Sequence, residues 1–160
     1  MKKIILSHWA FILGLLTGVG CLAVGSCTYE APVTDSPTHK VDPRLTGDWV
    51  SSDGKDKFVV RKLDDSSYVV SDNGDLFRAY HSDLGTTPFV SVQHLGMTDR
   101  KYVYVTWKLS ADGRQLSLRA VTTKVVPDTI KNSADIRSLL DKNKQNPELF
   151  GEELSLTKAN

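Results

Sequence analysis

The stretch from Lys101 to Val121, KYVYVTWKLSADGRQLSLRAV, carries the clearest structural signal in the chain. Its first half alternates two sets of side chains, Val103, Val105, Trp107 and Leu109 against Tyr102, Tyr104, Thr106 and Lys108. A period of two is typical of a β-strand with different environments on its two faces. The turn residues Ala111–Arg114 follow, and alternation resumes from Gln115 to Val121. The stretch therefore predicts an antiparallel hairpin.

Shorter runs of the same kind flank this hairpin and are bounded by turn residues. The strongest turn signal is Asn73-Gly74, a pair that supplies the two positive φ values of a type I′ hairpin turn. The additional runs are Thr46–Ser51, Phe58–Leu63, Tyr68–Val70, Leu76–His81, Pro88–Leu95 and Glu153–Lys158. Eight sequential antiparallel strands can close into a barrel, which removes exposed sheet edges. The predicted fold is mainly β, an up-and-down meander that closes into a small eight-stranded barrel.

One segment changes period. Ile136, Leu139 and Leu140 recur at helical spacing between Ser133 and Asn143. Ser133 is predicted to be the N-cap, because its hydroxyl can accept a hydrogen bond from an unpaired backbone N–H of the first turn. The sequence thus predicts one late helix before the last strand.

Composition limits the partners. The chain has 160 residues, with 20 Lys and Arg against 19 Asp and Glu, and a formal net charge of +1. This balance leaves no excess of positive charge to neutralise a phosphate backbone, so no nucleic-acid partner is expected. Two cysteines are too few for a disulfide framework. No cofactor is predicted.

The N-terminus has the pattern of an export signal, with Lys2 and Lys3 before an apolar stretch from Ile4 to Gly25. The stretch ends in Val24-Gly25-Ser26-Cys27, which resembles the lipobox of bacterial lipoprotein precursors. The resemblance implies cleavage between Ser26 and Cys27, lipidation of Cys27, and a location in the cell envelope. In that family an Asp after the lipidated Cys is associated with retention in the inner membrane, and Thr28 is not an Asp. The resemblance therefore implies a location in the outer membrane, facing the periplasm, if the host is Gram-negative.

Two alternatives remain for this segment. Cleavage could precede Cys21, although Gly18 would then occupy the aliphatic position of the lipobox. The 22 residues from Ile4 to Gly25 are also long enough for an uncleaved transmembrane helix. The favoured division is a signal peptide over 1–26, a lipidated tether over 27–43 and a barrel domain over 44–160. Three of the six prolines lie between Thr28 and Pro43, which predicts a semi-extended tether reaching up to roughly 50 Å.

The segment Leu45-Thr-Gly47-Asp-Trp49 is similar to the Gly-x-Trp opening of lipocalins and other calycin-type barrels. The resemblance implies that Trp49 lies across the closed end of the barrel and that the late helix packs outside it. It also suggests Arg119 as a late arginine packed on the tryptophan. Thr98-Asp99 with Tyr102 loosely resembles the second lipocalin motif.

The sequence offers few groups for chemistry. His81 and His94 end adjacent predicted strands and could meet as metal ligands beside Asp83 or Asp99, although hydrogen-bonded rim histidines are commoner. His81-Ser82-Asp83 holds the residue types of a triad in consecutive positions, where alternating side chains cannot converge. The segment Asp72–Asp75 lacks the other ligands of a calcium loop. No catalytic residue and no metal ligand is predicted.

These observations favour a non-catalytic, lipid-anchored envelope module that binds a hydrophobic small molecule. Trp49, Tyr102 and Tyr104 are its candidate ligand contacts. The alternative is a protein-interaction module, a tethered inhibitor or an envelope assembly factor, with a filled barrel. The least favoured hypothesis is a hydrolase that uses His81 or His94.

Overall fold

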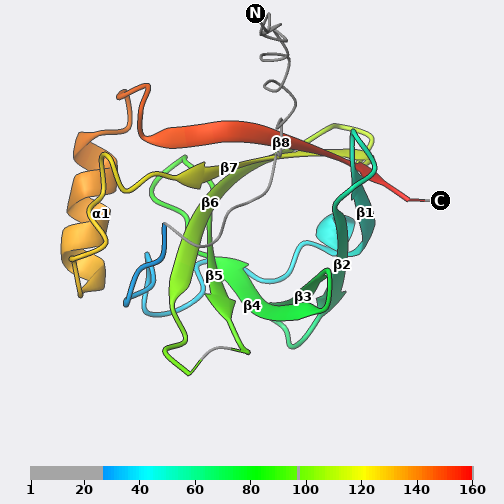
Figure 1. Cartoon of the computed structure of the whole chain (residues 1–160), viewed down its shortest axis with the longest axis horizontal. Coiled ribbons are helices and arrows are strands. Elements are labelled where there is room, and N and C mark those ends of the chain that lie inside the picture. The colour runs from blue at the N-terminus through cyan, green and yellow to red at the C-terminus, as the bar shows by residue number, and fades with distance from the viewer. Residues whose placement is uncertain (1–26, 97, 160) are drawn as a thin grey trace, which may run out of the picture.

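The computed structural model describes residues 27–96 and 98–159, and shows a closed barrel of eight sequential antiparallel strands with one helix beside it (Figure 1). The strands are β1 (Gly47–Ser51), β2 (Lys57–Lys62), β3 (Tyr68–Asp72), β4 (Asp75–His81), β5 (Phe89–His94), β6 (Tyr102–Leu109), β7 (Gln115–Val121) and β8 (Phe150–Lys158). Strand β8 pairs with β1 and closes the barrel. The predicted fold class is confirmed.

Local turn chemistry explains the two hairpins that the sequence marks most clearly. Asn73 and Gly74 have φ values of 48° and 100°, as a type I′ turn requires, and they join Asp72 to Asp75 across β3 and β4. In the second hairpin Leu109 lies opposite Leu116, and Gly113 takes up the positive φ of the turn.

Strand β8 begins at Phe150, three residues before the predicted start at Glu153. The reason is an irregularity in β7, where the register shifts between Arg119 and Val121 before Val121 pairs with Phe150. A bulge of this kind interrupts the alternation of side chains, and with it the sequence signal.

The helix α1 (Ser133–Lys142) packs outside the barrel (Figure 1). Its predicted N-cap was wrong by one residue, because the side chain of Asn132 accepts the hydrogen bond from Asp135 N–H at 2.9 Å. Ser133 starts the helix and donates its hydroxyl to Asp35 instead. No helix among the residues described is long and apolar enough to cross a membrane.

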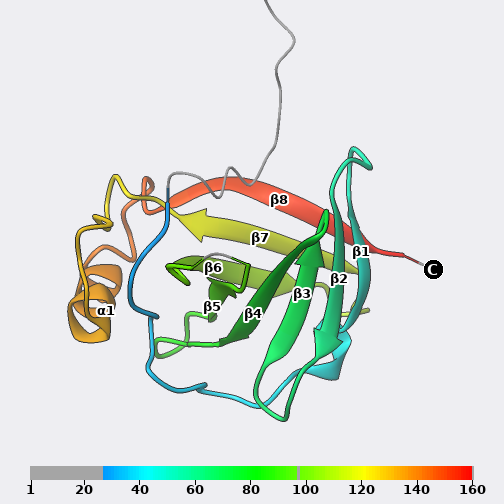
Figure 2. The same cartoon turned by 60° about the horizontal axis from the view of Figure 1, so that its bottom comes forward.

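Residues 28–42, called the strap below, lie along the barrel in the segment for which the sequence predicts a semi-extended tether. Figure 2 shows this blue to cyan segment running along the barrel, beginning between the barrel and α1. Tyr29 and Tyr102 exchange two backbone hydrogen bonds of 2.8 Å, so the strap begins as an extra strand contact on β6. The Tyr29 ring is fully buried and stacks on Tyr104 with 4.2 Å between ring centroids.

Further hydrogen bonds hold the strap in place. Tyr104 donates its hydroxyl to the carbonyl of Ala31, and Ser91 accepts from Val33 N–H at 3.1 Å. From the helix side, Arg137 donates to the Val33 carbonyl at 3.2 Å. The strap therefore joins α1 to the outer wall of the barrel.

The described residues bury two hydrophobic clusters as a result. The inner cluster fills part of the barrel and contains Leu45, Trp49, Phe58, Tyr68, Ala79, Leu116 and Leu156. The outer cluster lies between the barrel wall, the strap and α1, and contains Tyr29, Ala31, Val33, Phe89, Tyr104, Val121, Val126, Ile136, Leu140 and Leu149.

Because the strap packs against the barrel, we expect a mutation at Tyr29, outside the proposed barrel domain, to reduce the stability of the whole protein. Replacing Tyr29 with Ala removes a fully buried aromatic ring, and we expect the free energy of unfolding to fall by about 3–5 kcal/mol. Tyr29→Phe removes only the hydroxyl bond to the Val126 carbonyl and should cost about 1 kcal/mol. Urea denaturation followed by tryptophan fluorescence measures both changes.

Leu63→Ala is the control, because Leu63 is 54% exposed and its truncation should change stability by less than about 0.5 kcal/mol. An unfolding curve for Tyr29→Ala that overlays the parent curve would mean that the strap leaves the barrel in solution.

Candidate functional site

A cavity of about 160 Å³ lies inside the barrel, and its wall presents only apolar atoms. Every strand contributes to it, because alternate residues of each strand point inward. The lining residues are Leu45, Trp49, Phe58, Val60, Tyr68, Val70, Asp72, Phe77, Ala79, Val90, Val92, Val103, Val105, Trp107, Leu116, Leu118 and Leu156. An apolar cavity of about 150 Å³ is large enough to bind benzene, so this space admits a small apolar molecule.

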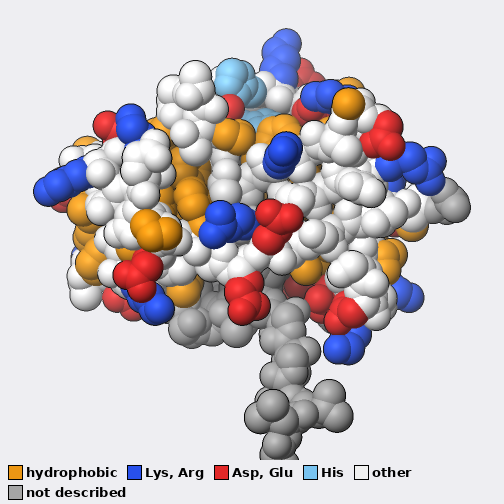
Figure 3. Space-filling model, turned by 90° about the horizontal axis from the view of Figure 1, so that it is seen from above, with side chains coloured by type: hydrophobic (Ala, Val, Ile, Leu, Met, Phe, Trp, Pro, Cys, Tyr) orange, Lys and Arg blue, Asp and Glu red, His pale blue; other side chains and the backbone are white. Residues whose placement is uncertain are grey.

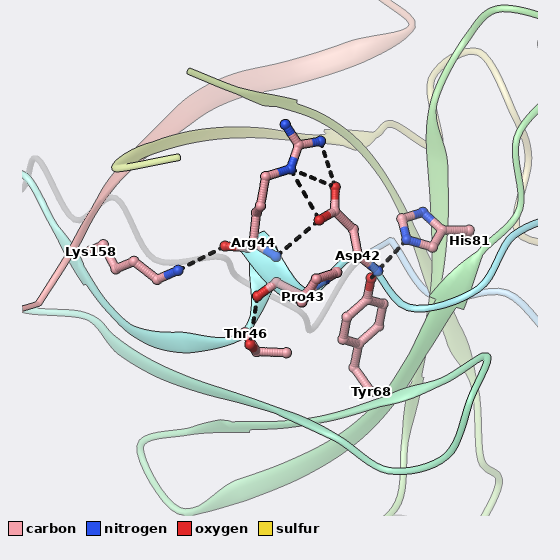
Figure 4. A network of polar contacts seen from close by, with 7 residues as sticks. All are labelled: Asp42, Pro43, Arg44, Thr46, Tyr68, His81 and Lys158. Carbon is pink, nitrogen blue, oxygen red and sulfur yellow. Dashed lines mark hydrogen bonds and ion pairs between the residues drawn. The ribbon is translucent and has the colours of Figure 1, made fainter. Parts of the chain in front are cut away.

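The end of the barrel where β1 begins is covered by the short 3₁₀ helix η1 (Pro43–Leu45) and by Trp49. The indole N–H of Trp49 donates to the Leu45 carbonyl at 2.9 Å. Lys158 lies over the Trp49 ring, with Nζ 5.1 Å from the centroid. Its ammonium donates to the Arg44 carbonyl at 2.8 Å (Figure 4). These contacts attach η1 to the two strands that close the barrel.

The suggestion that Arg119 packs on the tryptophan was wrong. Its guanidinium lies over Phe150, 5.4 Å from the ring centroid, and donates to the carbonyls of Phe150 and Gly151. The cation on Trp49 comes from Lys158, which lies opposite Trp49 in the β1–β8 pair.

Gly47 permits this arrangement. Its φ of +138° is rarely adopted by residues with a side chain, and a Cβ atom built there would lie 2.6 Å from Cε of Lys158. The glycine in the Gly-x-Trp segment thus leaves room for the lysine that covers the tryptophan.

Of the three candidate ligand contacts, only Trp49 lines the cavity. Tyr104 faces outward into the cluster under the strap, and Tyr102 packs against that same cluster. Their expected role as ligand contacts inside the barrel was therefore wrong. Burial raises the pKa of the Tyr104 hydroxyl, which stays protonated as the donor to Ala31.

A polar cluster lies at one end of the cavity, where Tyr68 on β3 meets His81 on β4 (Figure 4). The Tyr68 oxygen accepts from Asp42 N–H at 2.7 Å and lies 2.8 Å from Nε2 of His81. Burial raises the pKa of Tyr68 to about 12 and lowers that of His81, which is only 3% exposed. Both groups are therefore neutral at pH 7.

Two buried nitrogens beside this cluster lack a hydrogen-bond partner, Nδ1 of His81 and Nε1 of Trp107. The rings of the two residues lie 5.6 Å apart between centroids. The sequence places Trp107 on the inward face of its strand, but no local signal brings it to His81.

The possible metal pair of His81 and His94 does not form. Both residues end their strands, and in an antiparallel pair the two C-terminal ends lie at opposite ends of the ladder. His81 accordingly lies opposite Val90, whereas His94 lies opposite Phe77. Within residues 27–96 and 98–159, no group of three or more His, Cys, Asp or Glu side chains is placed to hold a metal ion.

Asp72 is the one carboxylate that lines the cavity among the described residues. Burial, together with the charges of Asp56 and Asp75, raises its pKa. On the outer surface, Lys and Arg side chains lie interspersed with Asp, Glu and hydrophobic side chains over the face seen in Figure 3.

Cys27 lies at the start of the described chain, with Sγ 4.0 Å from Oγ1 of Thr123. Ser26, the other residue of the predicted cleavage site, lies outside the described residues.

No protein-family model, no curated protein and no solved structure matches the chain.

The lowered pKa of His81 predicts a dependence of stability on pH. The ordinary histidine pKa is 6.5, so the unfolded chain binds a proton at His81 more readily than the folded chain as the pH falls through 6.5. We expect the free energy of unfolding to decrease from about pH 7.5 to about pH 5.5. Urea denaturation at a series of pH values measures the slope.

The slope should be smaller in His81→Gln and unchanged in Leu63→Ala, which alters an exposed side chain without a titratable group. A slope that survives the loss of His81 would assign the pH dependence to other groups.

Proposed function

We propose that this protein is a lipid-anchored module of a bacterial cell envelope whose barrel binds a small hydrophobic molecule without catalysing a reaction. The observation that carries the binding role is the apolar cavity of about 160 Å³. Binding pockets for small molecules are concave, mostly apolar and largely preformed. This cavity has those properties, and its volume limits the ligand to about the size of benzene.

Small side chains on adjacent strands support this role. Ala79 lies opposite Val92, and Val92 lies opposite Val103, so one row across β4, β5 and β6 holds no large residue. An eight-stranded barrel is just wide enough for large side chains to fill it. The row of small residues therefore accounts for the space that remains.

The alternative, a protein-interaction module, draws support from one surface feature. Leu76 and Leu95 are 49% and 41% exposed, and they are neighbours through a backbone hydrogen bond of 2.9 Å. A tethered inhibitor or assembly factor could use such side chains at an interface. The cavity favours ligand binding, because this alternative expects a filled barrel.

The calycin-like relationship is proposed on the architecture. Support comes from the sequential eight-stranded barrel, the helix outside it, and Trp49 covering the end at which β1 begins. This likeness assigns neither a ligand nor a reaction to the chain, because a fold alone does not specify a function.

Lipid anchoring is proposed on the sequence from Lys2 to Cys27 and on its resemblance to lipoprotein precursors. Several acyl chains on one residue exceed what stable anchoring requires. Only Thr28 separates Cys27 from the fully buried Tyr29. An acylated Cys27 would therefore hold the barrel directly at the bilayer surface rather than on a long tether.

Ligand binding is tested with benzene and a cavity-filling variant. Benzene should raise the stability of the unmodified protein, by about 1.4 kcal/mol when its free concentration is tenfold above Kd. Ala79→Leu places a large side chain in the cavity wall and should abolish the effect. Thermal unfolding with and without benzene measures it.

Ala111→Leu is the matched control, because it makes the same change at an exposed turn and should keep the benzene effect. Equal stabilisation of Ala79→Leu and the unmodified protein would place benzene elsewhere. The absence of any effect in the unmodified protein would leave the protein-interaction alternative.

Lipidation is tested by comparing the two cysteines. Cys27→Ser should leave the precursor unacylated and unprocessed, so that its intact mass equals that of the 160-residue chain with the apolar stretch Ile4–Gly25 still attached. Cys21→Ser should be lipidated normally. Intact-mass measurement reads out both variants, and an acylated Cys27→Ser protein would refute this site of attachment.

A further inference from the structure

The interior of the barrel holds two unused hydrogen-bond donors next to a cavity that otherwise offers only apolar contacts. Trp107 contributes its ring to the cavity wall, and its Nε1–H has no partner. His81 is only 3% exposed, and its Nδ1 also lacks a hydrogen-bond partner. Buried polar groups are nearly always paired, so two adjacent exceptions require an explanation.

The contacts of Tyr68 decide which nitrogen of His81 carries the proton. Because its oxygen already accepts from Asp42 N–H, the Tyr68 hydroxyl proton is best placed by donation to Nε2 of His81. The neutral imidazole then carries its proton on Nδ1. The opposite tautomer would leave the Tyr68 proton without an acceptor. His81 Nδ1 is thus a donor, like Trp107 Nε1.

The two donors belong to one place in the barrel. The rings of His81 and Trp107 have centroids 5.6 Å apart with 52° between their planes, and the Tyr68 ring also lies 5.6 Å from that of His81. Trp107 lines the cavity and its Nε1 is buried, so the contact requires the indole to turn its N–H edge toward the cavity. Because Trp107 lines the cavity and His81 does not, a hydrogen-bond acceptor at this end of the cavity would meet the indole N–H first and the imidazole N–H behind it.

We propose that the ligand is a small apolar molecule that carries one hydrogen-bond acceptor, such as a carbonyl oxygen, which binds to Trp107 Nε1–H with His81 Nδ1–H as a second donor. This inference rests on the proposed binding function and specifies its ligand class. A neutral acceptor fits better than an anion here, because no cationic side chain among the described residues lines the cavity.

The test uses two probes of the same shape, cyclopentanone and methylenecyclopentane, which differ only in a carbonyl oxygen against a methylene group. Both are close to benzene in size. The readout is the indole N–H resonances of Trp49 and Trp107 in a two-dimensional nitrogen–proton NMR spectrum, assigned with the variants Trp49→Phe and Trp107→Phe. Trp49 serves as an internal control, because its indole N–H already donates to Leu45.

We expect cyclopentanone to move the Trp107 indole proton downfield, as a new hydrogen bond does, and to move that of Trp49 much less. Methylenecyclopentane should bind without this downfield shift. The spectrum of the unmodified protein alone can therefore overturn the proposal, and a variant that fails to fold does not prevent the test.

Affinities give the second measurement. The ratio of the Kd of methylenecyclopentane to the Kd of cyclopentanone should fall by about threefold to tenfold in Trp107→Phe, because the variant loses the donor and keeps an aromatic wall. The two probes differ in their free energy of transfer from water. This difference is the same for every protein, so it cancels when the ratio in the variant is compared with the ratio in the unmodified protein. Val92→Ala changes the wall without removing a donor and should leave the ratio unchanged.

The outcomes separate the two proposals. If both probes bind and neither moves the Trp107 indole proton downfield, or if Trp107→Phe keeps the ratio, the cavity binds apolar molecules and the acceptor site is refuted. If neither probe binds, the proposed binding function fails and the acceptor site fails with it.

Discussion

The pairing of β1 with β8 is the interaction on which the cavity depends. A sheet with two free edges could flatten or associate, whereas closure fixes the inward direction for alternate residues of all eight strands. The pair is short, joining Trp49, Val50 and Ser51 to the end of β8. Lys158 reinforces it from the β8 side, since its chain covers the Trp49 ring and its ammonium binds the carbonyl of Arg44. Glycine suits position 47 because its φ of +138° is strained for residues with a side chain, and a Cβ atom there would also force the end of Lys158 to shift.

Closure also explains why the molecule has a second hydrophobic cluster. Strand β6 turns Val105 and Trp107 toward the cavity, so Tyr104 must face the outside. A buried tyrosine needs a cover and a hydrogen-bond acceptor, and the strap supplies both through Tyr29 and the Ala31 carbonyl. The helix α1 then covers the strap.

The strands were predictable because each has its own alternation and its own turn residues, as Asn73-Gly74 illustrates. The sequence did not predict which face of β6 points into the barrel. Alternation separates the two faces of a strand but does not identify the inner one, and both faces of β6 contact hydrophobic residues. The strap does carry a signal, because Tyr29, Ala31 and Val33 alternate and are all buried. Three residues beside prolines are too short a pattern to distinguish a docked segment from a tether. The cluster of Tyr68, His81 and Trp107 depends on strand register and on the strap, neither of which is a local property.

The chemistry of the cavity follows from where its small and its polar residues lie. Ala79, Val92 and Val103 determine how much space is left, and replacing any of them with a larger side chain would reduce it. Trp107 and His81 determine what that space can recognise, because a wholly apolar ligand leaves their two N–H groups unpaired at a cost of about 1–3 kcal/mol each. A ligand with one acceptor removes part of that cost and still places most of its surface against valine and leucine. Its free energy of binding then comes mainly from apolar burial, while its orientation comes from a single polar contact, which is the division expected of a small-molecule site.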